Sequence, residues 1–238
     1  MNRFQFQTVP NIIAGLGTIQ ELFKILKNGR YQRLLLVTDP GMLKQQLHLP
    51  ILDIIEAAGL EYVIYSDVQA DPPEYVVLEA AAFAKQENID VVLGFGGGSS
   101  MDVAKLIAIL AHPEQHQTLS DLYGVDNATG PRLALILVPT TAGTGSEVTP
   151  ISIVTTGETT KTGIVAPILY ADVAILDATF TQNLPAQITA ATGIDAMVHA
   201  IEAYTSKHKK NPYSDMLAKQ ALRLLNANLP RVLQDGYD

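Results

Sequence analysis

A glycine-rich segment in the middle of the chain carries the clearest chemical signal in the sequence. It reads Gly94-Phe95-Gly96-Gly97-Gly98-Ser99-Ser100-Met101-Asp102, between an apolar run and a stretch with helical periodicity. Successive glycines let a backbone approach a pyrophosphate, and a helix N-terminus offers unpaired N–H groups and a positive dipole end. We predict that this turn binds phosphate, with Ser99 or Ser100 as the helix N-cap and Asp102 in the first turn.

The glycines alone do not identify the ligand. The segment lacks the Gly-Lys-Ser/Thr of a Walker loop, and Ser99 stands where a Gly-x-Gly-x-x-Gly fingerprint ends in glycine. A tight strand-to-helix turn that binds nothing is the alternative.

Asp39 follows another apolar run, residues 34–38. A carboxylate at that place can accept hydrogen bonds from both hydroxyls of an adenosine ribose and would repel a 2′-phosphate, which favours NAD over NADP. Helix N-capping by Asp39 before Pro40 is an equally good interpretation of the local sequence.

A second loop, residues 139–147, is dense in hydroxyl groups and glycines. It follows a further apolar run and contains Thr140, Thr141, Thr144 and Ser146. Hydroxyl and amide donors suit phosphate and ribose oxygens, so we predict that this loop also contacts a nucleotide. A polar surface loop is the alternative.

Asp195 and His199 form a third candidate. They are four residues apart in an expected helix, so both side chains project from one face and could ligate a divalent cation through oxygen and nitrogen. A surface Asp–His pair is the alternative, and two ligands do not make a tight site.

The elements around these residues indicate an α/β fold. Continuously apolar runs at 34–37, 62–65, 90–93 and 133–138 are typical of strands buried on both faces. Residues 73–87 and 99–111 between them carry apolar side chains at helical spacing. Strands alternating with helices predict a parallel sheet.

The pattern changes near residue 180, where β-rich runs cease. We expect helices at about 186–206 and 214–228, the second ending at Leu229-Pro230. The predicted organisation is therefore a dinucleotide-binding α/β domain over 1–180 and the beginning of an all-helical domain over 181–238.

Composition excludes several functional classes. A formal net charge of −8 argues against a nucleic-acid surface, and the absence of cysteine removes disulfides, thiolate nucleophiles and Cys-ligated zinc. No apolar run approaches the roughly 18 residues of a membrane span, and the N-terminus lacks a secretion signal. We expect a cytoplasmic protein that binds neither nucleic acid nor membranes.

Taken together, three motifs resemble the iron-containing (group III) alcohol dehydrogenases. They are GGGSSMDVAK at 96–105, PTTAGTGSEVT at 139–149 and ATGIDAMVHAIEAY at 191–204, in the order and spacing of that family. The resemblance implies an N-terminal dinucleotide-binding domain, a C-terminal all-helical domain and an active site between them. It implies the cofactor NAD and a catalytic Fe²⁺ or Zn²⁺.

The resemblance also assigns roles by position. Five residues would hold the pyrophosphate: Gly96, Gly97, Gly98, Ser99 and Asp102. Six would line the rest of the cofactor: Thr140, Thr141, Thr144, Ser146, Val148 and Lys161. Asp39 would bind the adenosine ribose, and Asp195 and His199 would be the first two metal ligands, hence the catalytic pair.

The sequence departs from the family in one respect. The family completes its metal site with two later histidines, and none of His48, His112, His116 and His208 matches those positions. The first hypothesis is NAD-dependent hydride transfer to or from a small alcohol or aldehyde, with the metal as Lewis acid. The second is a truncated chain that binds NAD without turnover. A sugar-phosphate cyclase, a lyase, is the third, disfavoured because that class has Glu where Asp195 stands. Apolar helix faces left bare by the truncation predict a homo-oligomer.

Overall fold

The computed structural model describes residues 3–235, which divide into two compact units. The larger unit comprises Val9–Thr140 and Ser146–Ala178. The smaller unit contains the described residues up to Thr8, the loop Thr141–Gly145 and the described residues from Thr179 onward.

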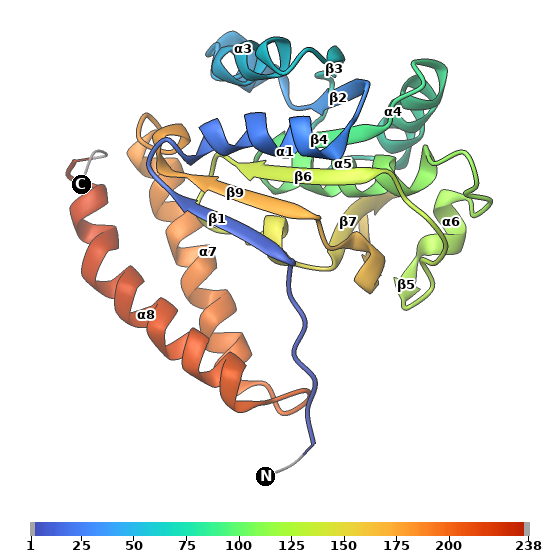
Figure 1. Ribbon diagram of the computed structural model, residues 1–238. Helices are drawn as coiled ribbons and strands as arrows, with labels where there is room; N and C mark the ends of the chain where they lie inside the picture. The colour runs from blue at the N-terminus through green and yellow to red at the C-terminus, as the bar shows by residue number, and fades with distance from the viewer. Residues whose placement is uncertain (1–2, 236–238) are drawn as a thin grey trace. The chain divides into compact units, whose positions relative to one another are not determined.

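The larger unit is built on six parallel strands in the order β1-β9-β6-β4-β2-β3 (Figure 1). The strands are β1 (Asn11–Gly15), β2 (Arg33–Val37), β3 (Glu61–Tyr65), β4 (Val91–Gly96), β6 (Ala134–Pro139) and β9 (Val173–Asp177). Every residue of β4, at the centre, is buried. The four apolar runs are confirmed as strands, because only apolar side chains can fill both faces of a covered parallel sheet.

Helices connect these strands. They are α1 (Glu21–Gly29), α2 (Pro40–Lys44), α3 (Leu49–Ala57), α4 (Glu74–Gln86), α5 (Gly98–Leu110) and α6 (Leu119–Leu122). Helix α5 contacts β4, β6 and α4, and its side chains beyond the first turn are buried almost without exception. The helices expected at 73–87 and 99–111 are confirmed to within a residue at each end.

A small second sheet was not anticipated. It consists of β5 (Gly124–Val125), β7 (Ile151–Thr156) and β8 (Thr160–Val165), in the order β5-β8-β7, with β7 and β8 forming an antiparallel hairpin. Strand β7 packs against α5, and its Ser152 and Val154 are buried while Ile151 and Ile153 are exposed. That alternation is the signal of a half-buried strand, and a search for continuous apolar runs passes over it.

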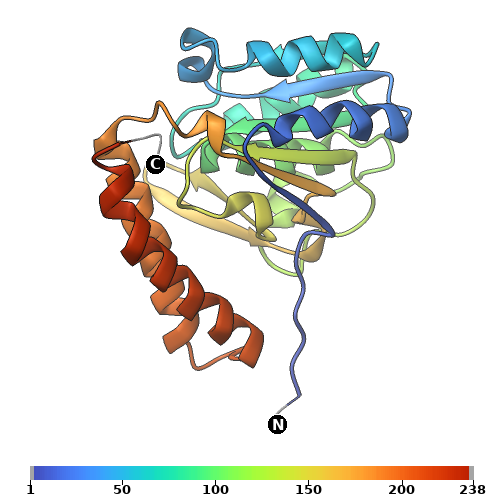
Figure 2. The ribbon, with the colours of Figure 1, turned by 60° about the vertical axis from the view of Figure 1, so that its left-hand side comes forward.

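The smaller unit contains two long helices, α7 (Ala186–Thr205) and α8 (Pro212–Val232), which lie side by side in both views (Figures 1 and 2). Gly193 permits their close approach, because a Cβ there would lie 2.5 Å from Leu229 Cδ1. The N-terminal segment joins this unit through Phe6, whose ring stacks on Tyr213 at 5.6 Å between centroids.

The predicted end of the second helix at Leu229-Pro230 is wrong. Helix α8 continues through Pro230 to Val232. Proline removes its own N–H bond and crowds the carbonyl four residues before it. The last turn closes nevertheless, with Leu233 N donating to Leu229 O at 3.1 Å. No helix of the described residues is long and apolar enough to cross a membrane.

Candidate functional site

The carboxyl ends of β2 and β4 flank the point where the strand order reverses. From β2 the chain proceeds outward to β3, whereas from β4 it proceeds in the opposite direction to β6. Loops that leave in opposite directions open a crevice between them, which is where ligands bind in open α/β sheets. Asp39 follows one of these strands and the glycine turn follows the other, so the topology brings two predicted site segments together.

The glycine turn requires its glycine at position 96. Gly96 has φ of +145°, and a Cβ there would lie 2.7 Å from Ser100 Oγ and 3.2 Å from Asp39 Oδ2. A side chain at this position would therefore be strained and would also fill the space between the turn and Asp39.

The prediction that Ser99 or Ser100 caps the following helix is wrong. Gly97 is the N-cap of α5, with extended backbone and no side-chain cap, and the helix begins at Gly98. Asp102 consequently lies beyond the first turn. Because glycine has no side chain to accept a hydrogen bond, the first N–H groups of α5 lack a side-chain cap and suit an anionic ligand.

Asp39 is confirmed as a helix N-cap, of α2. Its Oδ1 accepts from Gly41 N at 2.8 Å and from Met42 N at 3.2 Å. Its Oδ2 points toward Gly96 and has no hydrogen-bond partner within residues 3–235. The two interpretations of Asp39 are compatible, because capping occupies one oxygen and leaves the other for a ligand.

A pocket of about 290 Å³ lies between these segments. It is lined by Asp39, Pro40, Val68, Gln69, Ala70, Gly97, Gly98, Ser99 and Ser100. Residues 68–70 were not among the predicted site residues. They follow β3, the strand next to β2, and their position after a predicted strand was the signal that could have found them.

Two buried hydroxyl groups at the same edge of the sheet have no hydrogen-bond partner among the described residues, those of Thr38 and Thr140. Thr140 N donates to Gly96 O at 3.0 Å, which places this threonine beside the glycine turn, and Thr38 directly precedes Asp39. Buried hydroxyls normally bond to protein or to ordered water. Both side chains are buried, however, and neither lines the pocket beside Asp39.

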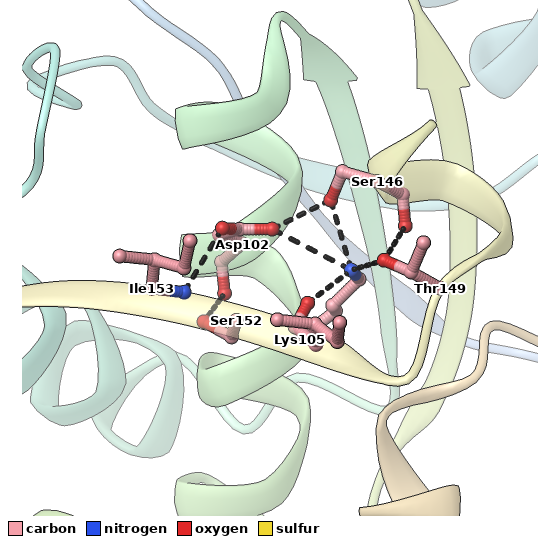
Figure 3. Close-up of polar contacts among 7 residues, drawn as sticks. Asp102, Lys105, Ser146, Thr149, Ser152 and Ile153 are labelled. Atoms are coloured by element: carbon pink, nitrogen blue, oxygen red, sulfur yellow. Dashed lines mark hydrogen bonds and ion pairs between the residues drawn. The ribbon is translucent and has the colours of Figure 1, made fainter. Parts of the chain in front are cut away.

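Asp102 and Ser146 meet in a buried polar cluster with Lys105 (Figure 3). Ser146, in the short helix η2 (Ser146–Val148), donates to Asp102 Oδ1 at 2.5 Å, and Asp102 Oδ2 accepts from Ile153 N at 3.0 Å. Lys105 Nζ donates to Ser146 Oγ at 2.8 Å and to Ile151 O at 2.6 Å. Lys105 is the last residue of the motif at 96–105, but the sequence alone indicated no role for it.

Burial perturbs two charged groups of this region. It lowers the pKa of the Lys105 ammonium, and the attraction of Asp102 and Glu147 opposes that shift without cancelling it. Burial likewise raises the pKa of the Glu147 carboxyl, against a hydrogen bond from its own backbone and the charge of Lys105. Each group is close to a charge of opposite sign, yet the loss of hydration on burial is the largest contribution to both pKa shifts.

The structure does not bring Lys161 or Val148 to the pocket beside Asp39. Lys161, on β8, forms an exposed ion pair with Asp71, with 2.6 Å between Nζ and Oδ1. Val148, in η2, is partly buried against the hydrophobic core. Their predicted contacts with a cofactor stay predictions.

In the smaller unit, the loop Thr141–Gly145 lies against α7. A Cβ on Gly143 would be 2.7 Å from both the Cβ and the carbonyl oxygen of Thr192. The loop that carries Thr141 and Thr144 is therefore in contact with the helix that carries Asp195 and His199.

Asp195 and His199 lie on the same face of α7. His199 Nε2 is 3.7 Å from Asp195 Oδ1, and both side chains are about half exposed. No third His, Asp or Glu of residues 3–235 joins them in a group that could hold a metal ion. Two donors are too few for a catalytic metal, so their predicted role as metal ligands stays a prediction.

Comparison with known proteins shows similarity to one family along most of the chain. Residues 10–178 match the family profile described as iron-containing alcohol dehydrogenase, and residues 189–238 match the C-terminal profile of the Fe-containing alcohol dehydrogenase family. The sulfoacetaldehyde reductase of Bilophila wadsworthia is 37% identical over 234 residues, covering 98% of this chain and 60% of that protein. The NAD-dependent methanol dehydrogenase of Bacillus methanolicus is 35% identical, covering 96% of this chain and 60% of that protein.

A solved structure of 1,3-propanediol oxidoreductase superposes with a TM-score of 0.93 at 33% identity, covering 99% of this chain and 61% of that one. This similarity confirms the predicted fold class, a parallel-sheet α/β domain followed by a helical segment. The chain spans about 60% of the length of these relatives.

Proposed function

The chain belongs to the iron-containing alcohol dehydrogenase family, and from that premise we propose that it binds NAD for hydride transfer between the coenzyme and a small alcohol or aldehyde. The pocket between Asp39 and the glycine turn carries the proposal. It combines an N-terminus of α5 with no side-chain cap, a carboxylate oxygen without a partner among residues 3–235, and apolar walls.

Each part of the pocket suits one part of the coenzyme. The N–H groups at the start of α5 face the pyrophosphate, with Gly97, Gly98 and Ser99 at the point of contact. Asp39 Oδ2 accepts from the adenosine ribose, and the apolar side chains of Val68 and Ala70 flank the adenine. Bound NAD supplies the hydride acceptor, C4 of the nicotinamide, and the chain supplies binding and orientation.

Asp195 and His199 contribute two of the metal ligands in this proposal. Oxygen and imidazole donors suit Fe²⁺ or Zn²⁺. The relatives are longer than this chain, and we assign the remaining ligands to the part of them that it does not span. The substrate class follows the relatives, whose names include an aldehyde, methanol and a diol.

A second candidate function is coenzyme binding without turnover. The incomplete metal site among the described residues favours it. Both candidates share the coenzyme pocket and differ only in whether this chain by itself completes the chemistry.

Coenzyme titration and an activity assay distinguish these candidates. NADH fluorescence should be enhanced on binding and should saturate, with weaker binding of NADPH because Asp39 repels a 2′-phosphate. An alcohol–NAD assay with added Fe²⁺ or Zn²⁺ then separates the two, since turnover supports the dehydrogenase and binding without turnover supports the second candidate. Absence of NADH binding by folded protein would contradict both.

The proposal includes a cytoplasmic setting and self-association. NAD is a coenzyme of the cell interior, and the absence of cysteine is compatible with a reducing compartment. Self-association follows from the exposed apolar side chains of the long helices α7 and α8, and sedimentation velocity tests it.

A further inference from the structure

We propose that Lys105 is a positioning residue of the coenzyme site, whose ammonium group holds the segment 146–153 against helix α5. The inference rests on the proposed function, because α5 begins at the glycine turn and the segment 146–153 directly follows the threonine-rich loop, Thr141–Gly145. Lys105 itself is completely buried and therefore touches neither coenzyme nor substrate.

The contacts of Lys105 reach across three elements. From α5, its Nζ donates to Ser146 Oγ in η2 at 2.8 Å and to Ile151 O at the start of β7 at 2.6 Å, with Thr149 Oγ1 at 3.4 Å (Figure 3). One side chain thus bonds to the segment at residues 146, 149 and 151.

The directions of the surrounding hydrogen bonds require a hydrogen-bond donor at the position of Lys105 Nζ. The Ser146 hydroxyl donates to Asp102 Oδ1, and the Thr149 hydroxyl donates to Ser146 O at 3.3 Å. Both hydroxyl oxygens therefore present lone pairs toward Nζ, and the Ile151 carbonyl can only accept. With Asp102 Oδ1 at 3.5 Å, four acceptors surround Nζ and share the three hydrogens of the ammonium group.

Asp102, on the same helix, adds further hydrogen bonds between α5 and the segment 146–153. Its Oδ1 lies 3.5 Å from Lys105 Nζ, its Oδ2 accepts from Ile153 N at 3.0 Å, and its carbonyl accepts from Ser152 Oγ at 3.0 Å. Asp102 and Lys105 are three residues apart, so they project from one face of α5. Beyond Asp102, Glu147 in η2 is the other charged group that acts on Lys105.

An ammonium group buried in this way is a poor source of global stability. Removing it from water costs free energy that the nearby carboxylates do not fully offset, and apolar side chains often replace buried ion pairs without loss of stability. What an apolar replacement cannot supply is the directed set of hydrogen bonds to residues 146–151. The expected defect of an apolar variant is therefore local.

The sharpest test introduces a cysteine, because the chain has none of its own. Lys105→Cys is alkylated in denaturant with 2-bromoethylamine, which rebuilds an ammonium side chain of nearly the same length, or with 1-bromopropane, which builds an apolar one of the same size. Each form is refolded and titrated with NADH. Lys85→Cys, at an exposed position of α4, is treated identically as the control.

We expect the aminoethyl form to bind NADH within about twofold of the unmodified wild type and the propyl form to bind about tenfold more weakly. Hydrogen exchange of residues 146–153 should be slow in the first form and fast in the second, with β2 unchanged in both. Equal NADH affinity of the two forms would overturn the proposal, because filling the space would then suffice.

A stability control separates positioning from general destabilisation. Ile109→Ala removes a buried side chain near the far end of α5 and should lower the melting temperature without weakening NADH binding. If Ile109→Ala weakens binding as much as the propyl form does, the positioning role is withdrawn. It is also withdrawn if Lys105→Cys refolds in none of its forms while wild type refolds after the same treatment.

If the proposed function is wrong and the chain does not bind NAD, the same experiments give a different pattern of results. Folded wild type would then bind no NADH, while the exchange of residues 146–153 would still depend on the ammonium. Binding by wild type together with equal affinity of the two alkylated forms overturns only the role of Lys105.

Discussion

Polar side chains around the glycine turn fall into two groups. Asp102, Ser146 and Lys105 satisfy one another and hold the protein together. Asp39 uses one carboxylate oxygen for capping, and Thr140 has a buried hydroxyl without a partner among residues 3–235. Carboxylate and hydroxyl groups thus complete the fold in the first group, whereas in the second we propose that the remaining carboxylate oxygen of Asp39 binds the coenzyme.

Asp39→Asn tests the two uses of that side chain separately. Asn retains an oxygen for capping, so the free energy of unfolding should change by less than about 0.5 kcal/mol. Loss of the negative charge should narrow the preference for NADH over NADPH by about tenfold. Fluorescence titration with each coenzyme measures this, and an unchanged preference would show that Asp39 serves only as a cap.

Gly96→Ala should both destabilise the protein and abolish tight NADH binding. The φ of +145° disfavours any side chain, and the new Cβ would press on Ser100 Oγ. Strain of this kind costs about 1–3 kcal/mol, measurable by urea denaturation. A variant with wild-type stability and wild-type affinity would contradict the geometry of the turn.

Ion pairing at the start of a strand makes the larger unit sensitive to acid. Asp172, just before β9, accepts from both terminal nitrogens of Arg132 at 2.8 Å and from Leu135 N of β6 at 2.8 Å. Burial by itself would raise the pKa of Asp172, but the hydrogen bonds from Arg132 and Leu135 and the Arg132 charge outweigh it and lower the pKa.

Asp172→Asn should therefore be less stable than wild type at neutral pH, by an amount that shrinks in acid. Because the pKa of Asp172 is lower in the folded chain than its unfolded value of about 4, its contribution is complete above that pH and is lost as the pH falls through the folded pKa. Urea denaturation from pH 7 to pH 3 measures the difference. A difference independent of pH would contradict this account.

Contact between the threonine-rich loop and α7 depends on Gly143. Gly143→Ala would place a methyl group 2.7 Å from the Thr192 carbonyl, part of a helix backbone that cannot yield easily. We expect a loss of about 1–3 kcal/mol in the free energy of unfolding, typical of overpacking, and weaker NADH binding as the loop moves. Gly163→Ala in β8 is the matched control, since a Cβ there meets nothing within 4 Å. Equal stability of the two variants would contradict the close contact between Gly143 and Thr192.

The long helices expose many apolar side chains within the smaller unit. Those exposed include Ile188, Ile194, Val198, Ile201, Met216, Leu217 and Leu224. Exposed apolar side chains on two neighbouring helices favour association with another apolar surface.

Self-association at roughly tens of micromolar is the expected result for this chain, driven by burial of that surface. Replacing Ile201 and Leu224 together by serine should shift the population toward monomer without altering NADH affinity. Sedimentation velocity over a range of concentrations measures both proteins. A wild-type chain that stays monomeric throughout the range would contradict the prediction.

The sequence by itself determined the parallel sheet, the helices that cover it and the glycine turn between β4 and α5. Continuous apolar runs, helical periodicity and adjacent glycines are local signals, and each is read within about a dozen residues. The same is true of the long helices that follow residue 185.

Only the tertiary structure decided which polar residues meet. Asp102 and Ser146 are 44 positions apart, and the family resemblance assigns both to the coenzyme site. The packing of η2 and β7 on α5 joins them to Lys105. It also joined the loop after β3 to the pocket and left Lys161 outside it. Hydrogen bonding depends on distance and direction between segments, and neither quantity is encoded in the spacing of residues along the chain.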